Sequence, residues 1–277
     1  MTLVLIGPVC EDLIIIGDER VSKVGGASYF QSFVYEEFYN DYLLVVNASN
    51  PNLIEEFPDK SKVKLILKDD THYFINEYPN KDNLDIRNQS TNFADIPITA
   101  DDLKSIFDDF DNDIDAFVLN PLNSNDFSIE TLEYLNSLKK PIYVSLQGFL
   151  RFIGPDGSIV LKSSEILDYL NEFSAYVFLD ENEANVIKDS SLYQSKEVIL
   201  IVTNGSKGSK IINSSNEDIK VNAVKCNNVV DATGCGDTYM AAFLSSRLNG
   251  KDLKESAEFA SLLASKKLEI SGPYKKL

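Results

Sequence analysis

Histidine is almost absent from this chain of 277 residues, which contains only His72. Zinc hydrolase sites and Ser-His catalytic pairs both depend on imidazole, so neither chemistry is well supported. Cysteine is scarce as well. Cys10, Cys226 and Cys235 share no metal-ligand spacing and cannot all pair with one another. This usage predicts a reducing, cytoplasmic setting and not a disulfide framework.

Long apolar runs and positive charge are also in short supply. No stretch approaches the ~20 apolar residues of a membrane span, and the first residues, 1–7, resemble a strand more than a signal peptide. The chain has 26 Lys and Arg against 43 Asp and Glu, a net charge of −17. This acidity disfavours nucleic acid and membrane surfaces as partners, but it permits a nucleotide, because backbone amides can hold phosphates.

The pattern along the chain is that of one α/β domain spanning 1–277. Short apolar runs alternate with helical segments, which predicts a central, mainly parallel sheet with helices on both faces. The expected strands lie near 3–6, 13–16, 42–46, 116–119, 142–146, 175–179 and 198–202. The expected helices lie near 27–39, 99–110, 128–138, 163–170, 180–188, 235–248 and 253–267. Two further strands, near Ile211 and Val221, are predicted to be antiparallel.

Two segments do not fit this alternation. The segment 62–75 reads as two strands, and the polar stretch 77–97 looks like an excursion from the main domain. We expect a small β lid built from segments near 12–24 and 71–90. The alternative for the polar stretch is a solvated surface loop.

The most informative segment is Asp231-Ala-Thr-Gly-Cys-Gly-Asp237, which precedes an apolar helix. Gly234 and Gly236 allow a tight turn around Cys235, and the free amides of a helix start attract an anion. A carboxylate inside such a turn would repel a phosphate, which predicts that Asp237 acts as a base toward an attacking hydroxyl. The alternative is a plain helix cap, which explains Asp237 but not the glycines.

This segment resembles the late signature of the ribokinase-like (PfkB-type) carbohydrate kinases, usually Asp-Thr-x-Gly-Ala-Gly-Asp. The resemblance implies a ribokinase-like three-layer α/β sandwich, with Asp237 as the base and the amides of residues 234–237 as an anion hole. Ala232 and Cys235 depart from the usual residues. A thiol at position 235, beside the phosphate path, suggests sensitivity to oxidation.

The acceptor site is expected near the N-terminus. The family carries an aspartate followed by a glycine pair, which here correspond to Asp12 and Gly25-Gly26. A carboxylate can accept two hydrogen bonds from a diol. Phe30 stands where many members have an asparagine, so we expect the usual amide contact with the sugar to be either missing or moved, with Gln31 as the candidate position. Without the resemblance, a simple turn is the better interpretation of Asp12 and the glycines.

Asp180 and Glu183 follow a predicted strand and share one face of the next helix. They form either a capping box or, as the family's Asn-x-x-Glu motif implies, a magnesium site. The segment Thr203-Asn-Gly-Ser-Lys-Gly208 resembles the family's nucleotide-binding loop, with Thr203, Gly205, Lys207 and Gly208 near ATP. The alternative is a hairpin turn with a solvated lysine.

Gln147 and Arg151 follow another strand and are expected to contact the acceptor, although a surface loop would explain them as well. The phrases Gln147-Gly-Phe-Leu-Arg151, Tyr73–Tyr78 and Arg87-Asn-Gln89 resemble the branch that phosphorylates cyclic polyols such as myo-inositol.

The sequence therefore predicts a cytoplasmic ATP- and Mg²⁺-dependent kinase for a sugar or cyclic polyol, either monomeric or homodimeric. The alternatives are a nucleoside kinase and a non-catalytic sugar-binding or regulatory relative.

Overall fold

The computed structural model describes residues 2–78, 88–110, 113–155, 158–213 and 218–276. Within these residues the main sheet has nine strands in the order β15-β14-β13-β12-β9-β8-β1-β4-β5. Neighbouring strands from β13 to β5 are parallel, and β14 and β15 are antiparallel additions. The strands are β1 (Thr2–Ile6), β4 (Tyr42–Ala48), β5 (Val63–Leu67), β8 (Ile114–Leu119), β9 (Ile142–Ser145), β12 (Ser174–Asp180), β13 (Ile199–Thr203), β14 (Ser209–Ile212) and β15 (Ile219–Val221).

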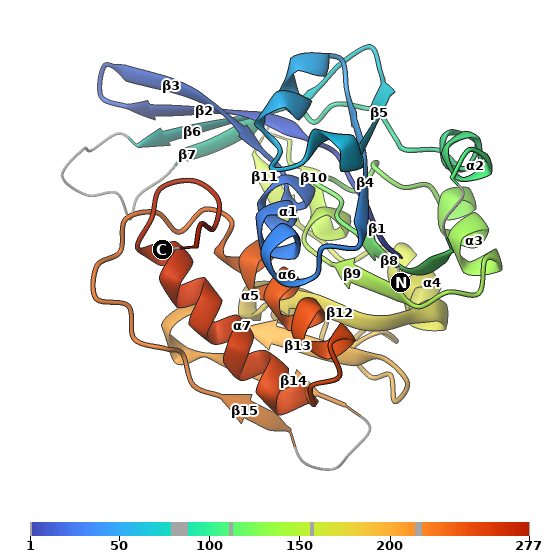
Figure 1. Ribbon diagram of the computed structural model, residues 1–277, viewed down its shortest axis with the longest axis vertical. Coiled ribbons are helices and arrows are strands. Elements are labelled where there is room, and N and C mark those ends of the chain that lie inside the picture. Colours follow the sequence, from blue (N-terminus) through green and yellow to red (C-terminus); the bar gives the residue numbers. More distant parts are fainter. Residues whose placement is uncertain (1, 79–87, 111–112, 156–157, 214–217, 277) are drawn as a thin grey trace.

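Helices cover both faces of this sheet and complete three layers (Figure 1). In β1, Leu3 and Leu5 pack toward one face and Val4 and Ile6 toward the other, as expected for a strand buried on both sides. One face carries α1 (Ala27–Phe38), α6 (Cys235–Leu248) and α7 (Leu253–Leu268). The opposite face carries α2 (Ala100–Asp108), α3 (Ile129–Ser137), α4 (Ile166–Phe173) and α5 (Glu181–Ile187). The predicted three-layer α/β sandwich with a central, mainly parallel sheet is confirmed.

A separate four-stranded sheet has the order β3-β2-β6-β7 and projects from the body (Figure 1). Its strands are β2 (Cys10–Ile16), β3 (Glu19–Gly25), β6 (His72–Tyr78) and β7 (Asn88–Thr91). Both expected lid segments therefore contribute strands to one sheet. Residues 79–87 of the second segment, with Arg87, lie outside the described residues.

Helix α1 begins after Gly26, as expected, and Gly25 is the last residue of β3, because residues 19–25 pair with β2 in a hairpin. A second hairpin, β10 (Arg151–Ile153) with β11 (Ile159–Leu161), was not predicted. Such three-residue strands are too short to give a hydrophobic period that can be recognised.

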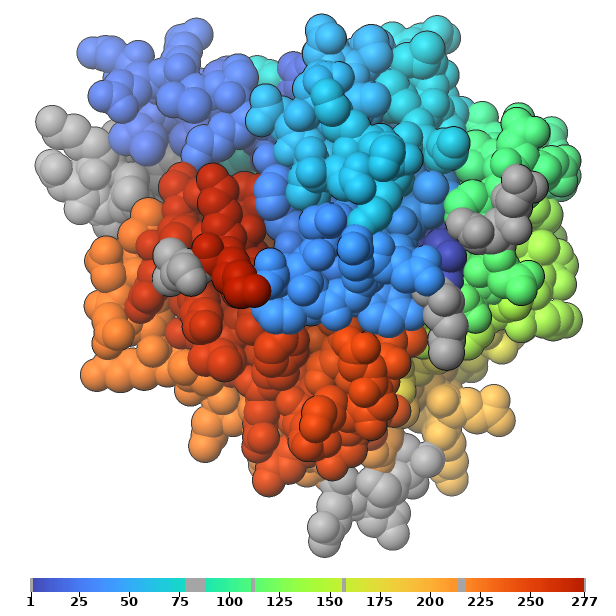
Figure 2. All heavy atoms as spheres, viewed as in Figure 1, coloured from blue at the N-terminus to red at the C-terminus, as the bar shows by residue number. Residues whose placement is uncertain are grey.

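The C-terminal segment packs against the end of α1. The dark red C-terminal segment lies beside the blue α1 in Figure 2, and the rings of Phe38 and Tyr274 are 6.0 Å apart. Phe38 also meets Phe259 of α7 edge to face at 5.2 Å. These contacts join the end of α1 to α7, and α6 packs against both helices, so the elements before and after the glycine turn form one framework. None of the described helices has the length and apolar character needed to cross a bilayer.

Candidate active site

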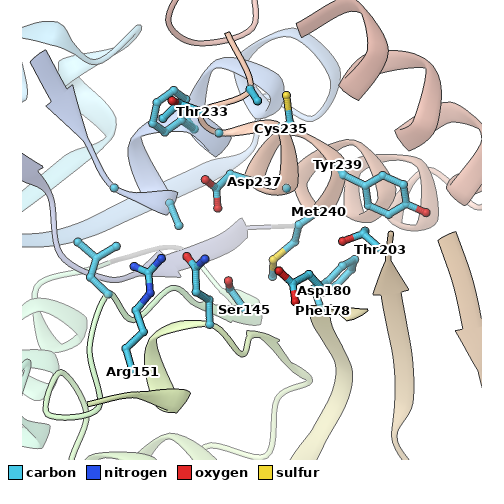
Figure 3. A pocket seen from close by; sticks show the side chains of 18 of the residues that line it. Ser145, Arg151, Phe178, Asp180, Thr203, Thr233, Cys235, Asp237, Tyr239 and Met240 are labelled. Atoms are coloured by element: carbon cyan, nitrogen blue, oxygen red, sulfur yellow. The ribbon is translucent and has the colours of Figure 1, made fainter. Parts of the chain in front are cut away.

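A cavity of about 390 Å³ lies between the second sheet and the carboxyl ends of the central strands. Open α/β sheets place their ligands at this edge. The central strands contribute Ser145, Asp180 and Thr203, each at the end of its strand. The second sheet contributes Asp12, Phe74, Asn76 and Gln89, and the turn before α6 contributes Thr233 to Asp237. The structure therefore gathers most of the predicted site residues around one space (Figure 3).

The turn before α6 is held by its own polar groups. Asp231 Oδ1 accepts a 2.9 Å hydrogen bond from the Thr233 amide. Gly234 is left-handed, with φ +75°, and serves as the N-cap residue of α6. The Cys235 amide donates to Ala232 O at 3.2 Å. The Cys235 amide is therefore not available to an anion. The remaining amides of the predicted anion hole include those of Gly236 and Asp237, which lie in the first helical turn and lack partners within the helix.

Asp237 is directed into the cavity, and Arg151 approaches from the opposite wall (Figure 3). Burial raises the pKa of the Asp237 carboxyl to about 6, and the charge of Arg151 opposes this rise. A carboxyl with this pKa is mostly ionised at pH 7 and can still accept a proton, which suits a general base. The Arg151 guanidinium also lies 5.8 Å from the ring centroid of Phe74, so it lies beside the wall formed by the second sheet.

Cys235 points away from this centre (Figure 3), and its Sγ lies 4.0 Å from Ala264 O of α7. Burial raises the pKa of the thiol to about 11. The thiolate is the reactive form, so a neutral-pH thiol in this position is protected. The expected sensitivity to oxidation at Cys235 is therefore not supported by its surroundings.

The glycine pair makes room for Asp12. A Cβ at Gly25 would lie 2.3 Å from Asp12 Oδ2, so a larger residue there would displace the carboxylate. Gly26 has φ +102°, and a Cβ on it would lie 2.7 Å from Pro8 O. Asp12 also accepts a long 3.8 Å contact from Cys10 Sγ. Asp12 and Gly26 line the cavity. Gly25 does not line it, but its lack of a side chain leaves room for the Asp12 carboxylate.

Gln31 is not brought into the cavity. Its side chain is fully buried and exchanges hydrogen bonds of 2.9 and 3.0 Å with the Asn120 amide. Consecutive residues of a helix point in directions about 100° apart, so the start of α1 after Gly26 directs Phe30 to the cavity and Gln31 into the core. Phe30 therefore forms an apolar part of the wall at the position where an amide was sought.

Asp180 and Glu183 form the capping box of α5 and also line the cavity. Asp180 Oδ1 accepts from the Glu183 amide, and Glu183 Oε2 accepts from the Asp180 amide, both at 2.8 Å. Burial raises the pKa of Glu183 to about 7. Each carboxylate keeps one oxygen outside the box, so the two alternatives, cap and metal site, are compatible. The described residues contain no group of three side chains arranged to hold a metal without help.

Thr203 lines the cavity, but Gly205, Lys207 and Gly208 do not. Lys207 is exposed in a 3-10 turn (Gly205–Lys207) between β13 and β14. A Cβ at Gly208 would lie 2.1 Å from Val221 O, so this glycine allows the close passage of the chain after β15. The hairpin alternative accounts for the positions of these three residues.

Sequence reasoning missed several cavity residues as site residues. Asn76 and Gln89 lie on adjacent strands, with Gln89 Nε2 donating to Asn76 Oδ1 at 2.9 Å. Cys10, Ser145, Tyr239 and Met240 also line the space. The period-two pattern of β6 places Phe74 and Asn76 on one face, a signal that could have identified Asn76 once the strand was assigned to a lid.

A second cavity of about 400 Å³ adjoins the first, and Asp12, Phe30 and Thr233 line both. Its other walls come from the β2–β3 hairpin, from Tyr29 and Leu53, and from the segment near Gly272. Asp12 thus lies at the junction of two spaces.

The comparisons with known proteins follow this geometry. Residues 168–277 match the pfkB family of carbohydrate kinases. The match includes Asp180, Glu183, Thr203 and the Asp231–Asp237 turn, and the family consists of phosphotransferases, as the sequence predicted.

A nucleoside kinase from Methanocaldococcus jannaschii is 32% identical over 123 residues, covering 43% of this chain and 40% of the relative. The matched segment thus spans well under half of that relative. Among solved structures, a pyrophosphate-dependent kinase of the ribokinase family, in its sulfate complex, has a TM-score of 0.81 at 19% identity. That similarity covers 99% of this chain and 97% of the neighbour. A second structure, a pyrophosphate-dependent kinase with a pyrophosphate analog and myo-inositol, has a TM-score of 0.79 at 18% identity, covering 99% and 97%. These structures share the fold of this protein.

Proposed function

We propose that this protein transfers a phosphoryl group from ATP to a hydroxyl of a cyclic polyol or a related sugar, with myo-inositol the first acceptor to test. The observation that carries this proposal is the position of Asp237. A carboxylate with a pKa of about 6 faces Arg151 across a cavity. It lies in the first turn of α6, where the amides of Gly236 and Asp237 lack partners within the helix and can bind an anion.

In the proposed reaction, Asp237 accepts the proton of the attacking hydroxyl as the new O–P bond forms and the bond to the leaving phosphate breaks. The amides around Gly236 stabilise the charge on the transferring group, and the dipole of α6 adds to this effect. Arg151 neutralises charge on the opposite side, which keeps Asp237 ionised at neutral pH.

Asp180 and Glu183 would hold magnesium, each through its oxygen outside the capping box and through water. Magnesium bound there would neutralise charge on the donor phosphates. The raised pKa of Glu183 fits this role, because a nearby cation would stabilise the ionised form that burial disfavours. Thr203 lies at the end of the adjacent strand and bounds the donor side of the cavity.

The acceptor side combines hydrogen-bonding groups with one apolar wall. Asp12, Asn76, Gln89 and Gln147 offer carboxylate and amide groups, and Phe30 supplies an apolar face. A rigid ring that carries several hydroxyls matches such a surface. Polar groups left unpaired in a buried site are costly, so we expect strong discrimination between stereoisomers.

A nucleoside kinase is the second candidate. A segment of 123 residues is 32% identical to the nucleoside kinase from Methanocaldococcus jannaschii. The second cavity, which is lined by the aromatic side chains of Tyr29 and Phe30, would accommodate a nucleobase next to a ribose held by Asp12. A non-catalytic binding protein is less well supported, because a binding site has no use for a buried base at Asp237.

The deciding experiment is steady-state kinetics with inositols, hexoses, ribose and nucleosides, each with Mg²⁺ and either ATP or pyrophosphate. We expect turnover with a cyclic polyol and ATP, and phosphorus NMR of the product identifies the hydroxyl. A preference for a nucleoside would overturn the acceptor, and a preference for pyrophosphate would overturn the donor. Absence of turnover throughout the panel, with specific thermal stabilisation by one sugar, would favour the non-catalytic alternative.

A further inference from the structure

Lys267 is the one lysine of the described residues with no solvent exposure. Lysines are almost never fully buried unless they are paired, because removing a charge from water is costly. Lys267 belongs to the last turn of α7, next to the exposed Lys266. Neighbouring groups must therefore provide the hydrogen bonds that water would otherwise make to the ammonium.

The ammonium group of Lys267 is surrounded by oxygen atoms from two segments. Nζ donates to Asp231 O at 2.9 Å and to Ile270 O at 3.3 Å, and Asp231 Oδ2 is 3.7 Å away. Asp231 is thus engaged through both its main chain and its side chain. The carboxylate is 20% exposed, so much of its charge is compensated from within the protein.

Asp231 in turn fixes the start of the anion-binding turn. Its Oδ1 accepts from the Thr233 amide at 2.9 Å, and its Oδ2 accepts from the Gly272 amide at 3.0 Å. The amides of Val230 and Asp231 donate to Leu268 O at 2.8 and 3.2 Å. The turn, the end of α7 and the segment after it therefore meet at the Lys267–Asp231 pair.

We infer that Lys267 is a built-in cation that positions the turn 231–237 and adds a fixed positive charge behind it. This inference rests on the proposed function, since the turn is there assigned to hold the transferring phosphate. Lys267 does not itself line the cavity and is a positioning residue. Its influence on the turn is also seen at Cys235, where the Lys267 charge opposes the burial that raises the thiol pKa.

A fixed cation in this place offsets the negative charge that would otherwise repel a phosphate from the turn. The net charge is −17, and Asp231 and Asp237 lie at the two ends of the turn that should receive a phosphate. An internal ammonium offsets the nearest of these carboxylates without any need for an ion from solution. The interaction between the buried ammonium of Lys267 and its neighbours is strong, because solvent screening is weak inside the protein.

Three variants test this inference. Lys267→Met removes the charge and keeps most of the side-chain volume, Lys267→Ala leaves space for a small amine, and Lys266→Met is the matched control one residue away. We expect Lys267→Met to lower kcat ~10²-fold while the acceptor KM changes little, since a misplaced reacting group costs about this much. Lys266→Met should keep the wild-type kcat.

Chemical rescue separates a hydrogen-bonding ammonium group from a merely structural role. In Lys267→Ala, n-propylammonium replaces the missing atoms, and we expect it to raise kcat ~10-fold or more, whereas tetramethylammonium, which has no N–H donor, should not. A Lys267→Met variant with a kcat within twofold of wild type would overturn the inference. So would a loss of kcat in Lys267→Ala that neither amine, or both amines equally, reverses.

Hydrogen exchange tests the same point without turnover. We expect Lys267→Met to exchange faster in peptides covering 230–237 and to match wild type in peptides covering β14, and n-propylammonium should restore protection in Lys267→Ala. Equal acceleration in both regions would assign Lys267 to global stability and overturn the inference. If the wild-type protein phosphorylates nothing in the panel, the proposed function fails, and this measurement still decides the role of Lys267.

Discussion

The ring of Phe30 occupies the space that a side chain at Gly234 would need. A Cβ at Gly234 would lie 2.2 Å from Phe30 Cδ1, and the residue has φ +75°. Helix α1 can therefore pack against the turn before α6 because Gly234 has no side chain. Phe30 shapes one wall of the cavity and the turn before α6 at the same time.

The first prediction compares two left-handed glycines. Gly234→Ala should lower kcat ~10²-fold, because its side chain would meet Phe30 beside the cavity. Gly250→Ala is the control, since Gly250 is also left-handed, with φ +86°, but follows the end of α6, and a Cβ there meets no atom within 4 Å. Steady-state kinetics with thermal melting separates the two, and equal activity in both variants would contradict the role of the Phe30–Gly234 contact.

The second prediction concerns Asp237. Asp237→Asn should lower turnover by ~10² to 10⁴ with nucleotide affinity nearly unchanged. In the wild-type enzyme, kcat/KM should fall as pH drops through about 6, because the buried carboxyl then gains a proton and cannot act as a base. A pH–rate profile and nucleotide titration check both points. Near wild-type turnover in Asp237→Asn would remove this residue from the mechanism.

The third prediction concerns the influence of Arg151 on that base. The guanidinium lowers the pKa of Asp237, so Arg151→Met should move the acidic limb of the kcat/KM profile to higher pH. Lys162→Met, at an exposed lysine just after β11, is a control for general loss of positive charge. An unshifted limb in Arg151→Met would mean that the two charges do not interact in the working enzyme.

The fourth prediction concerns Glu183. Glu183→Gln keeps an oxygen that can accept from the Asp180 amide, so the start of α5 should survive. The loss of charge should raise the magnesium concentration required for half-maximal activity more than it raises the acceptor KM. Magnesium titrations at saturating acceptor measure this. Unchanged magnesium dependence with a lower melting temperature would leave Glu183 as a cap only.

The fifth prediction concerns Asp12. Asp12→Ala should reduce acceptor kcat/KM by ~10² or more, because a hydrogen bond to a charged group contributes roughly 1.5–3 kcal/mol and a diol makes two. Asp18→Ala, at the exposed tip of the same hairpin, should change little. Kinetics at varied acceptor, with saturating donor, compares the variants. If both behave alike, the carboxylate does not hold the acceptor.

Sequence patterns predicted the main sheet because its strands are buried on both faces and read as continuous apolar runs, as in residues 3–6 and 42–46. Helix starts also follow recognisable residue types: Thr99 and Asp102 form a capping box at the start of α2. The glycine turn could be placed because its residue types are unusual together. Motif spacing therefore located the centre of the site.

What the sequence could not predict depends on contacts between distant segments. Gln31 matched the expected spacing, but Asn120, 89 positions away, engages its amide in the core. Asn76 and Gln89 became neighbours only through strand pairing. Lys267 gives no local sign of burial, since its helix also carries the exposed Lys266. Long-range packing decides which polar residues face a cavity.

The scarcity of histidine has a practical consequence. His72 is fully buried at the start of β6, with Nε2 2.9 Å from Asp126 Oδ1, and Asp126 also accepts from the amides of Leu122 and Asn123 in the main body. The joint between the projecting sheet and the body thus contains the chain's one imidazole. Its ring resonances form an isolated spectroscopic signal, and any ligand that tilts the sheet would be visible there without isotope labelling of individual sites.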